Sequence, residues 1–261
     1  MLILIAESKT MKTEERPVTP QSWSMHAPAD EKRAERIMDT LADLTVPELA
    51  SRLKLSGSLA VKMHKMVYEF KNKALGIEAI DAYTGVVFKA LRFDELSAAA
   101  KRECIEDVRI ISSLYGFLRP DDIIKPYRLD FTAKGEWGGS GVEKTLAAFW
   151  KQYATIQLVN KLNDGNYTEI LDLLPGDAGK CIDWKITKRF AKVWKVDFVE
   201  LQEGGVRKTP NAGKLKTMRG ELLRQILEEG VKTVAEVKQL ASDHYVCEGT
   251  PVYPDHLSFL C

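Results

Sequence analysis

The spacing of apolar residues along the chain predicts both buried strands and amphipathic helices. A continuous apolar run of strand length opens the chain at residues 1–6, and further strands are predicted at 108–114 and 168–174. Elsewhere, apolar residues three and four positions apart predict helices, some of them with recognisable starts such as Asp30 and the first-turn proline Pro47. The predicted helices cover residues 30–43, 47–53, 59–70, 86–91, 95–104, 142–162, 177–186, 215–229 and 234–241.

Turn signals between these elements indicate the fold class. Gly204 and Gly205 lie between two further apolar segments, 190–201 and 206–209, and predict a β-hairpin. We also expect a strand at 77–83, an extended segment at 245–260 and a long loop at 13–28. Because strands and helices do not alternate strictly, we predict an α+β fold: one domain over residues 1–261, with a mixed β-sheet flanked by helices.

Composition changes this picture little. Hydrophobic residues make up 45% and charged residues 29% of the 261 positions, which is ordinary for a globular protein. The apolar start lacks the basic region and cleavage site of a signal peptide, and no apolar run reaches the roughly 20 residues that span a bilayer. We therefore expect a cytoplasmic protein without a membrane partner and with reduced cysteines.

Charge is distributed unevenly along the chain. Residues 180–224 contain twelve cations and five anions, a net +7, whereas the whole chain carries only +1. Such a segment is typical of a surface that binds a polyanion, although a run of charge can equally be a solvated face.

The segment 112–131, SSLYGFLRPDDIIKPYRLDF, combines aromatic rings, cations and two prolines. Pro120 and Pro126 exclude a continuous helix and predict a stiff loop. Arg119 and Arg128 leave this loop next to the prolines, so we expect both to face one cleft together with Lys9 and to bind phosphate. The alternative is that the neighbouring aspartates neutralise both arginines internally.

Three other places carry candidate phosphate contacts. Residues 47–71 resemble a helix-hairpin-helix unit, in which Gly57 would bring backbone amides to a phosphate; two helices packed only for the core are the alternative. Lys9 follows the first strand, a common position for ligand sites. In the basic helix near the C-terminus, Gly220 indicates the close approach of a backbone or a ligand. The predicted nucleic-acid-binding residues are Lys9, Gly57, Lys62, Arg119, Arg128, Lys214, Lys216, Arg219 and Arg224.

Several kinds of site are not expected. The chain has no glycine-rich phosphate loop, no G-x-S-x-G elbow and no H-E-x-x-H motif. His244 and Cys247 do not have the spacing of a structural zinc site. We expect no catalytic residues of these kinds, no bound metal and no cofactor.

The motifs, taken in order, resemble the YaaA peroxide-stress protein family. The start MLILIAESKT is similar to the family's MLILISPAKT-type start, and AYTGVVFKAL, at 82–91, to its Tyr-Thr-Gly segment. Residues 112–131 are similar to the signature L-Y-G-x-L-R-P…P-Y-R-L-E, with Asp130 in place of Glu. KTMRGELLRQIL, at 216–227, resembles the A-K-K-A-R-G-x-x-x-R region, while LAAFW and CEG fall where the family has Phe-Trp and Glu-Gly.

The chain departs from the family pattern at a few positions. Glu7 replaces a proline, Thr217 replaces a lysine, and residues 172–178 replace the segment N-L-A-S-x-E-Y. In that segment Pro175 and Ala178 stand for Ser and Tyr, and Asp177 stands for Glu.

The resemblance implies a DNA-binding protein of the response to hydrogen peroxide, one that limits unincorporated intracellular iron and carries no known catalytic reaction. Contacts would be mainly to phosphates, without sequence readout. Two alternatives stay open: an enzyme that acts on nucleic acid or a nucleotide through a Lys/Arg-lined cleft, and a protein-interaction factor with an indirect effect on iron.

Overall fold

The apolar run at the start of the chain forms a strand in the main sheet of the protein. The computed structural model describes residues 1–12, 26–72, 76–137, 139, 141–248 and 253–261. Its nine-stranded sheet has the order β11-β12-β13-β9-β8-β1-β3-β4, with β10 paired to β9. These strands are β1 (Leu2–Ala6), β3 (Val108–Ser112), β4 (Gly116–Leu118), β8 (Glu169–Asp172), β9 (Lys192–Leu201), β10 (Arg207–Lys208), β11 (Ala241–Ser242), β12 (Tyr245–Cys247) and β13 (His256–Leu260).

The sheet is mixed, which confirms the predicted α+β class. The neighbours from β13 through β9, β8 and β1 to β3 all pair in parallel. Both ends of the sheet are antiparallel, where β12 pairs with β11 and β13, and β4 pairs with β3. The glycine pair predicted to form a hairpin lies between the antiparallel strands β9 and β10. Two small ladders, β2 (Ile77–Glu78) with β5 (Ile123–Ile124) and β6 (Lys134–Gly135) with β7 (Lys144–Thr145), complete the strands.

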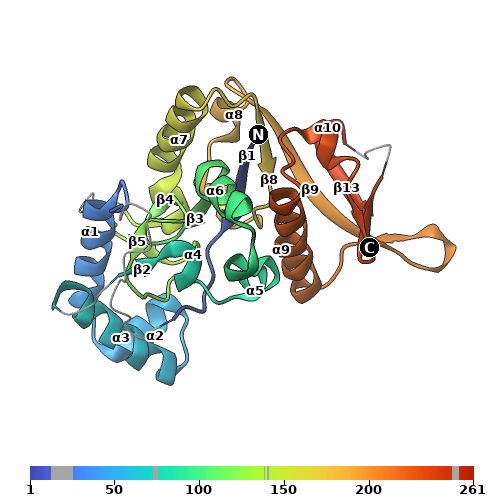
Figure 1. Ribbon diagram of the computed structural model, residues 1–261. Coiled ribbons are helices and arrows are strands. Elements are labelled where there is room, and N and C mark those ends of the chain that lie inside the picture. Colours follow the sequence, from blue (N-terminus) through green and yellow to red (C-terminus); the bar gives the residue numbers. More distant parts are fainter. Residues whose placement is uncertain (13–25, 73–75, 138, 140, 249–252) are drawn as a thin grey trace.

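Helices flank the sheet along its length (Figure 1). The N-terminal helices lie together at one end, and α9 with the C-terminal strands lies toward the other. The α-helices are α1 (Glu31–Ala42), α2 (Val46–Leu53), α3 (Gly57–Asn72), α4 (Ala79–Ala82), α5 (Val86–Leu91), α6 (Ala98–Asp107), α7 (Leu146–Asp164), α8 (Trp184–Thr187), α9 (Ala212–Glu228) and α10 (Val234–Val237). Short 3-10 turns occupy Phe93–Glu95, Ala178–Cys181 and Glu203–Gly205.

Some predicted elements are shorter or different. The strand predicted at 77–83 is wrong beyond Glu78, because α4 begins there and the amides of Ala79 and Ile80 bond to carbonyls of the loop 120–122. The helix predicted at 177–186 is divided, since Asp183 begins a new helix by capping α8 with its side chain. Most of the loop predicted at 13–28 lies outside the described residues.

The contact between α5 and α9 depends on Gly220. A Cβ atom at this position would lie 2.3 Å from the Val87 carbonyl oxygen and 2.7 Å from the Ala90 Cβ. The expectation of close backbone approach at Gly220 is therefore confirmed, and the approaching backbone belongs to α5. This contact fixes α9 beside the start of α5, where the site described below is formed.

Candidate functional site

A cleft of about 360 Å³ lies where the parallel strands β1 and β8 end. The residues that follow β1 form one wall, and those that follow β8 form another. The first residues of α5 and one side of α9 close the cleft. This placement agrees with the tendency of open α/β sheets to bind ligands beyond the carboxyl ends of their strands. The polar lining residues are Glu7, Ser8, Lys9, Thr10, Asp177, Lys216 and Arg219.

Helix α9 supplies two cations to the cleft. Lys216 and Arg219 are three residues apart and therefore lie on the same side of the helix. Lys216 is exposed, whereas Arg219 is half-buried, and its Nε is buried without a hydrogen-bond partner among the described residues. Burial lowers the pKa of this guanidinium, although Asp172, Asp197 and Asp177 oppose the shift. Arg219 is therefore a partly desolvated cation with an unused donor.

Lys9 connects this cleft to a second, smaller hollow. Its ammonium group bonds to Asp130, and its carbonyl oxygen accepts a 2.6 Å hydrogen bond from Arg128 Nη1. Burial opposes ionisation of Asp130, but the bonds from Lys9 and Thr132 lower its pKa to about 2. Lys9, Arg128, Asp130 and two cations of the α2 end, Arg52 and Lys54, line the hollow of about 140 Å³. Lys9 and Arg128 thus lie together, as the sequence predicts.

Glu7 is a half-buried acidic group of the cleft. Its Oε2 accepts a 2.8 Å hydrogen bond from the Ser113 amide and another from the Tyr127 hydroxyl. That hydroxyl also contacts Ser112 Oγ at 2.7 Å and the Tyr83 hydroxyl at 2.6 Å. Burial raises the pKa of Glu7 to about 7, against the lowering effect of these hydrogen bonds. Glu7 therefore changes charge near neutral pH.

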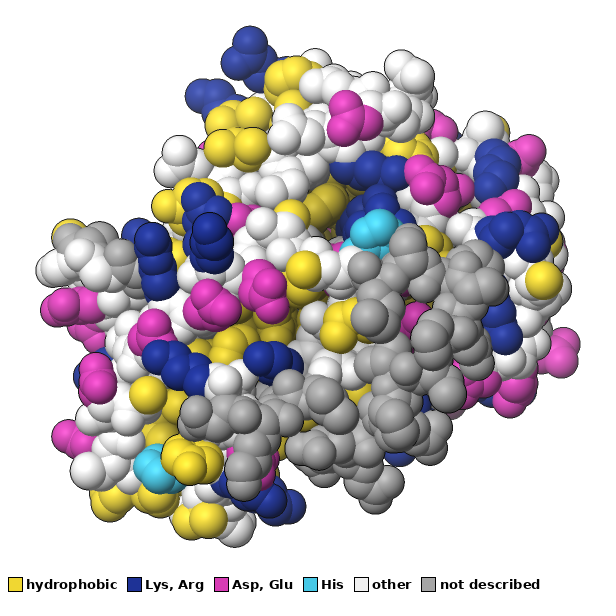
Figure 2. Space-filling model, turned by 60° about the vertical axis from the view of Figure 1, so that its left-hand side comes forward, with side chains coloured by type: hydrophobic (Ala, Val, Ile, Leu, Met, Phe, Trp, Pro, Cys, Tyr) yellow, Lys and Arg dark blue, Asp and Glu magenta, His cyan; other side chains and the backbone are white. Residues whose placement is uncertain are grey.

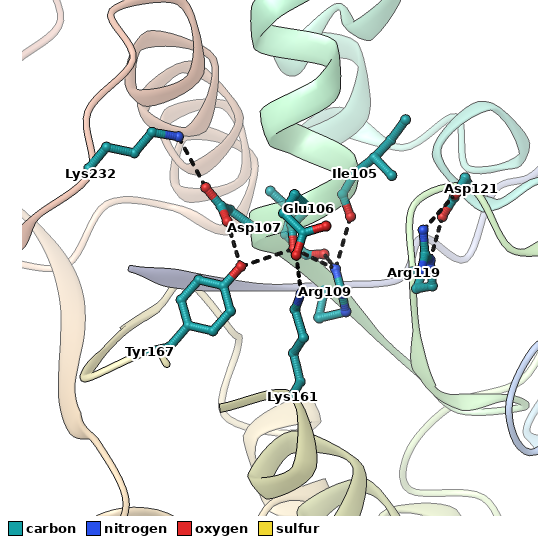
Figure 3. A network of polar contacts seen from close by, with 10 residues as sticks. Ile105, Glu106, Asp107, Arg109, Arg119, Asp121, Lys161, Tyr167 and Lys232 are labelled. Carbon is teal, nitrogen blue, oxygen red and sulfur yellow. Dashed lines mark hydrogen bonds and ion pairs between the residues drawn. The ribbon is translucent and has the colours of Figure 1, made fainter. Parts of the chain in front are cut away.

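Arg119 does not face the cleft together with Arg128 and Lys9, although the sequence predicts that it does. Its Nε and Nη2 bind Asp121 at 2.8 and 3.0 Å, so the prediction that Arg119 is free of an internal ion pair is wrong (Figure 3). The reason is the strand that precedes it. Because β4 runs antiparallel to β3, Arg119 comes one residue beyond the pair of Leu118 with Ile110 and approaches the amino end of β3. The cleft lies at the carboxyl end, and the chain returns there only at Tyr127.

Beside this pair, Figure 3 shows a separate polar network around the end of α6. The buried Arg109 donates to the carbonyl oxygens of Ile105, Glu106 and Val108. Tyr167 and Lys232 bind the side chain of Asp107. These bonds satisfy the last carbonyls of α6 and have a structural role.

The other predicted residues have varied surroundings. Lys214 pairs with Glu200 at 2.8 Å, and Arg224 donates to the Leu91 and Arg92 carbonyl oxygens at the end of α5. Gly57 and Lys62 are exposed on α3, which packs against α2. Both the helix-hairpin-helix interpretation and the alternative of two helices packed for the core require this contact.

The basic segment 180–224 is partly neutralised by acidic residues distant in sequence. Lys188 pairs with Asp255, and Arg207 pairs with Glu248. On the face shown in Figure 2, cationic and acidic side chains form alternating clusters. Adjoining hollows nevertheless link cations across the molecule. Arg219 lines both the cleft and a hollow of about 400 Å³ beside Arg207, and Lys9 joins the cleft to the hollow beside Arg52.

Sequence reasoning did not select Glu7 as a site residue. The one signal available was its position two residues before Lys9, where the resembled family has proline. Its burial depends on Tyr127 and Ser113, which are more than a hundred residues away in sequence.

The fold and the cleft define an α+β protein with cationic side chains at the carboxyl edge of its parallel strands. The sequence profile of the family described as Peroxide stress protein YaaA matches residues 1–250, and the chain belongs to this family. A UPF0246 protein of Desulforapulum autotrophicum is 31% identical over 255 residues, 95% of each chain. UPF0246 proteins of Parabacteroides distasonis and Crocosphaera subtropica are each 29% identical over 239 residues, 91% of each chain.

The resemblance drawn from the sequence motifs is therefore confirmed, and the name of the family supports a role in peroxide stress. Across the described part of the chain, no helix is both long and apolar enough to cross a membrane.

Proposed function

We propose that this protein binds DNA in the cytoplasm during the response to hydrogen peroxide, and that it thereby limits unincorporated intracellular iron. Family membership supports the peroxide part of the proposal. The observation that supports DNA binding is a set of three hollows that share the lining residues Arg219 and Lys9. Their cations include Arg207, Arg219, Lys216, Lys9 and Arg128.

Cations in several neighbouring hollows suit a polymer with regularly spaced phosphates. Contacts to phosphates supply most of the affinity of non-specific DNA binding and carry no base readout. The hollow that contains Lys9 and Arg128 is also lined by Arg52 and Lys54, at the end of α2. The helix pair α2–α3, with Gly57 and Lys62, would lengthen the same surface.

Replacing Lys216 and Arg219 by glutamine is expected to weaken binding to duplex DNA. Each lost phosphate contact should reduce the slope of log K against log salt by about 0.9, so the double variant should lose nearly two units of slope. Fluorescence anisotropy of a labelled duplex, titrated at several salt concentrations, measures both quantities.

Lys214→Gln is the matched control, because Lys214 lies on the same helix but pairs with Glu200 and does not line the cleft. It should leave the slope unchanged. An unchanged slope in a folded Lys216→Gln/Arg219→Gln protein would contradict the proposal that DNA lies over the cleft.

One observation favours a second function, an enzyme that acts on nucleic acid or a nucleotide. Glu7 lies in the same cleft as Lys216 and Arg219, and its pKa of about 7 suits proton transfer at neutral pH. Cleavage or modification of a nucleotide that depends on Glu7 would support this function.

A further inference from the structure

Glu7 contributes a titratable charge to the lining of the cleft. The charged lining side chains are three cations, Lys9, Lys216 and Arg219, and two acids, Glu7 and Asp177. The ammonium of Lys9 is bound to Asp130. The two remaining cations are therefore balanced when Glu7 is ionised, and one positive charge is in excess when Glu7 is protonated.

Donors fixed by the backbone hold Glu7 in the cleft wall. Ser112 Oγ accepts hydrogen bonds from the amides of Leu114 and Tyr115, at 3.1 and 3.0 Å. Its own proton is therefore directed to the Tyr127 oxygen, and Tyr127 in turn donates to Glu7 Oε2. Glu7 Oε2 accepts the hydrogen bonds from both Ser113 and Tyr127, and Glu7 Oε1 accepts neither of them.

We propose that the cleft is a proton-linked site for a phosphodiester, which Lys216 and Arg219 bind and which ionised Glu7 repels. The inference rests on the proposed DNA binding, because it assigns one phosphate contact of that function to the cleft. The guanidinium of Arg219, which lines the cleft, provides charged donors for a phosphate oxygen. The cleft volume of about 360 Å³ lies in the range of small-ligand sites and admits a group of nucleotide size.

The titratable groups around Glu7 show which of them can change charge between pH 6 and 8.5. Tyr83 and Tyr127 pack against it, and burial raises the pKa of each phenol well above its ordinary value. Burial likewise raises the pKa of the nearby Cys181 thiol. The other charged residues that line the same cleft as Glu7 are Asp177, Lys9, Lys216 and Arg219. Asp172, close to Arg219, has its pKa raised to about 6 by burial and titrates equally in a Glu7 variant.

The test uses a dinucleotide, thymidylyl-3′,5′-thymidine, because its single diester phosphate keeps the same charge between pH 6 and 8.5. Calorimetric titration of the wild-type protein at constant ionic strength is expected to give a Kd about tenfold lower at pH 6 than at pH 8.5. Glu7→Gln should bind more tightly than wild type at pH 8.5 and should keep only the smaller pH dependence that Asp172 contributes through Arg219. Arg219→Gln should bind weakly at both pH values. Glu35→Gln, which removes an exposed charge on α1 outside the cleft lining, should behave as wild type.

A second measurement needs no variant. Binding at pH 7 should be accompanied by proton uptake, detected as a dependence of the heat on the ionisation enthalpy of the buffer. The same pH dependence in wild type and Glu7→Gln, no proton uptake, or no binding of the dinucleotide at pH 6 would overturn the inference. If replacing Lys216 still lowers the salt slope of duplex binding, but the binding shows no pH dependence that Glu7→Gln removes, this inference alone is rejected. If the protein does not bind duplex DNA at all, the proposed function is rejected.

Discussion

Gly220→Ala is expected to destabilise the protein by about 3 kcal/mol, the upper part of the range for overpacked cores. In an exposed helix, alanine would instead be favoured over glycine by about 1 kcal/mol. Here the added Cβ would lie 2.3 Å from the Val87 carbonyl oxygen, a backbone atom of α5 that no side-chain rotation can move. The helices α5 and α9 must therefore separate. Chemical denaturation measures the change in the free energy of unfolding.

Gly57→Ala is a suitable control. Gly57 is the first residue of helix α3, and a Cβ atom added there would meet no heavy atom within 4 Å. We expect a change of less than about 1 kcal/mol, in the stabilising direction. If Gly220→Ala were as stable as wild type, the close contact of α5 with α9 would not be a constraint on the fold.

Glu7→Gln is expected to stabilise the protein at pH 8.5 by about 3 kcal/mol and to change its stability little at pH 4.5. The pKa of Glu7 is about 7 in the folded protein, against an ordinary value of 4.5. Between these values the folded state binds more protons than the unfolded state, so the stability of wild type falls as pH rises from about 4.5 to 7. Glutamine keeps the acceptor oxygen for Ser113 and Tyr127 but carries no charge to bury.

Chemical denaturation at a series of pH values tests this expectation. The quantity compared is the difference in the free energy of unfolding between wild type and Glu7→Gln. Burial also raises the pKa of Asp122 to about 7 and of Asp172 to about 6, and both groups titrate in each protein. Their contributions cancel in the difference, which leaves that of Glu7. A difference that does not vary with pH would show that Glu7 is not a desolvated carboxyl.

Local patterns in the sequence were enough to predict several elements and the resemblance to the family. Apolar periodicity was sufficient for β1, α1, α3 and α9, because burial of one face acts on residues close together in the chain. Gly220 could be identified as a close contact since glycine inside a helix is costly without a packing reason. Lys9 could be placed at a sheet edge because it directly follows a buried strand.

Which charged groups share the site depends on the packing of segments that are distant in sequence. The stiff loop 112–131 suggested that Arg119 and Arg128 act together, but the antiparallel pairing of β3 with β4 carries Arg119 to the other end of β3. Ion pairs such as Lys214 with Glu200 remove part of the charge counted along the sequence. Glu7 becomes a titrating group only because Ser113 and Tyr127 are folded against it. Desolvation and charge pairing depend on through-space neighbours, and sequence spacing does not encode these neighbours directly.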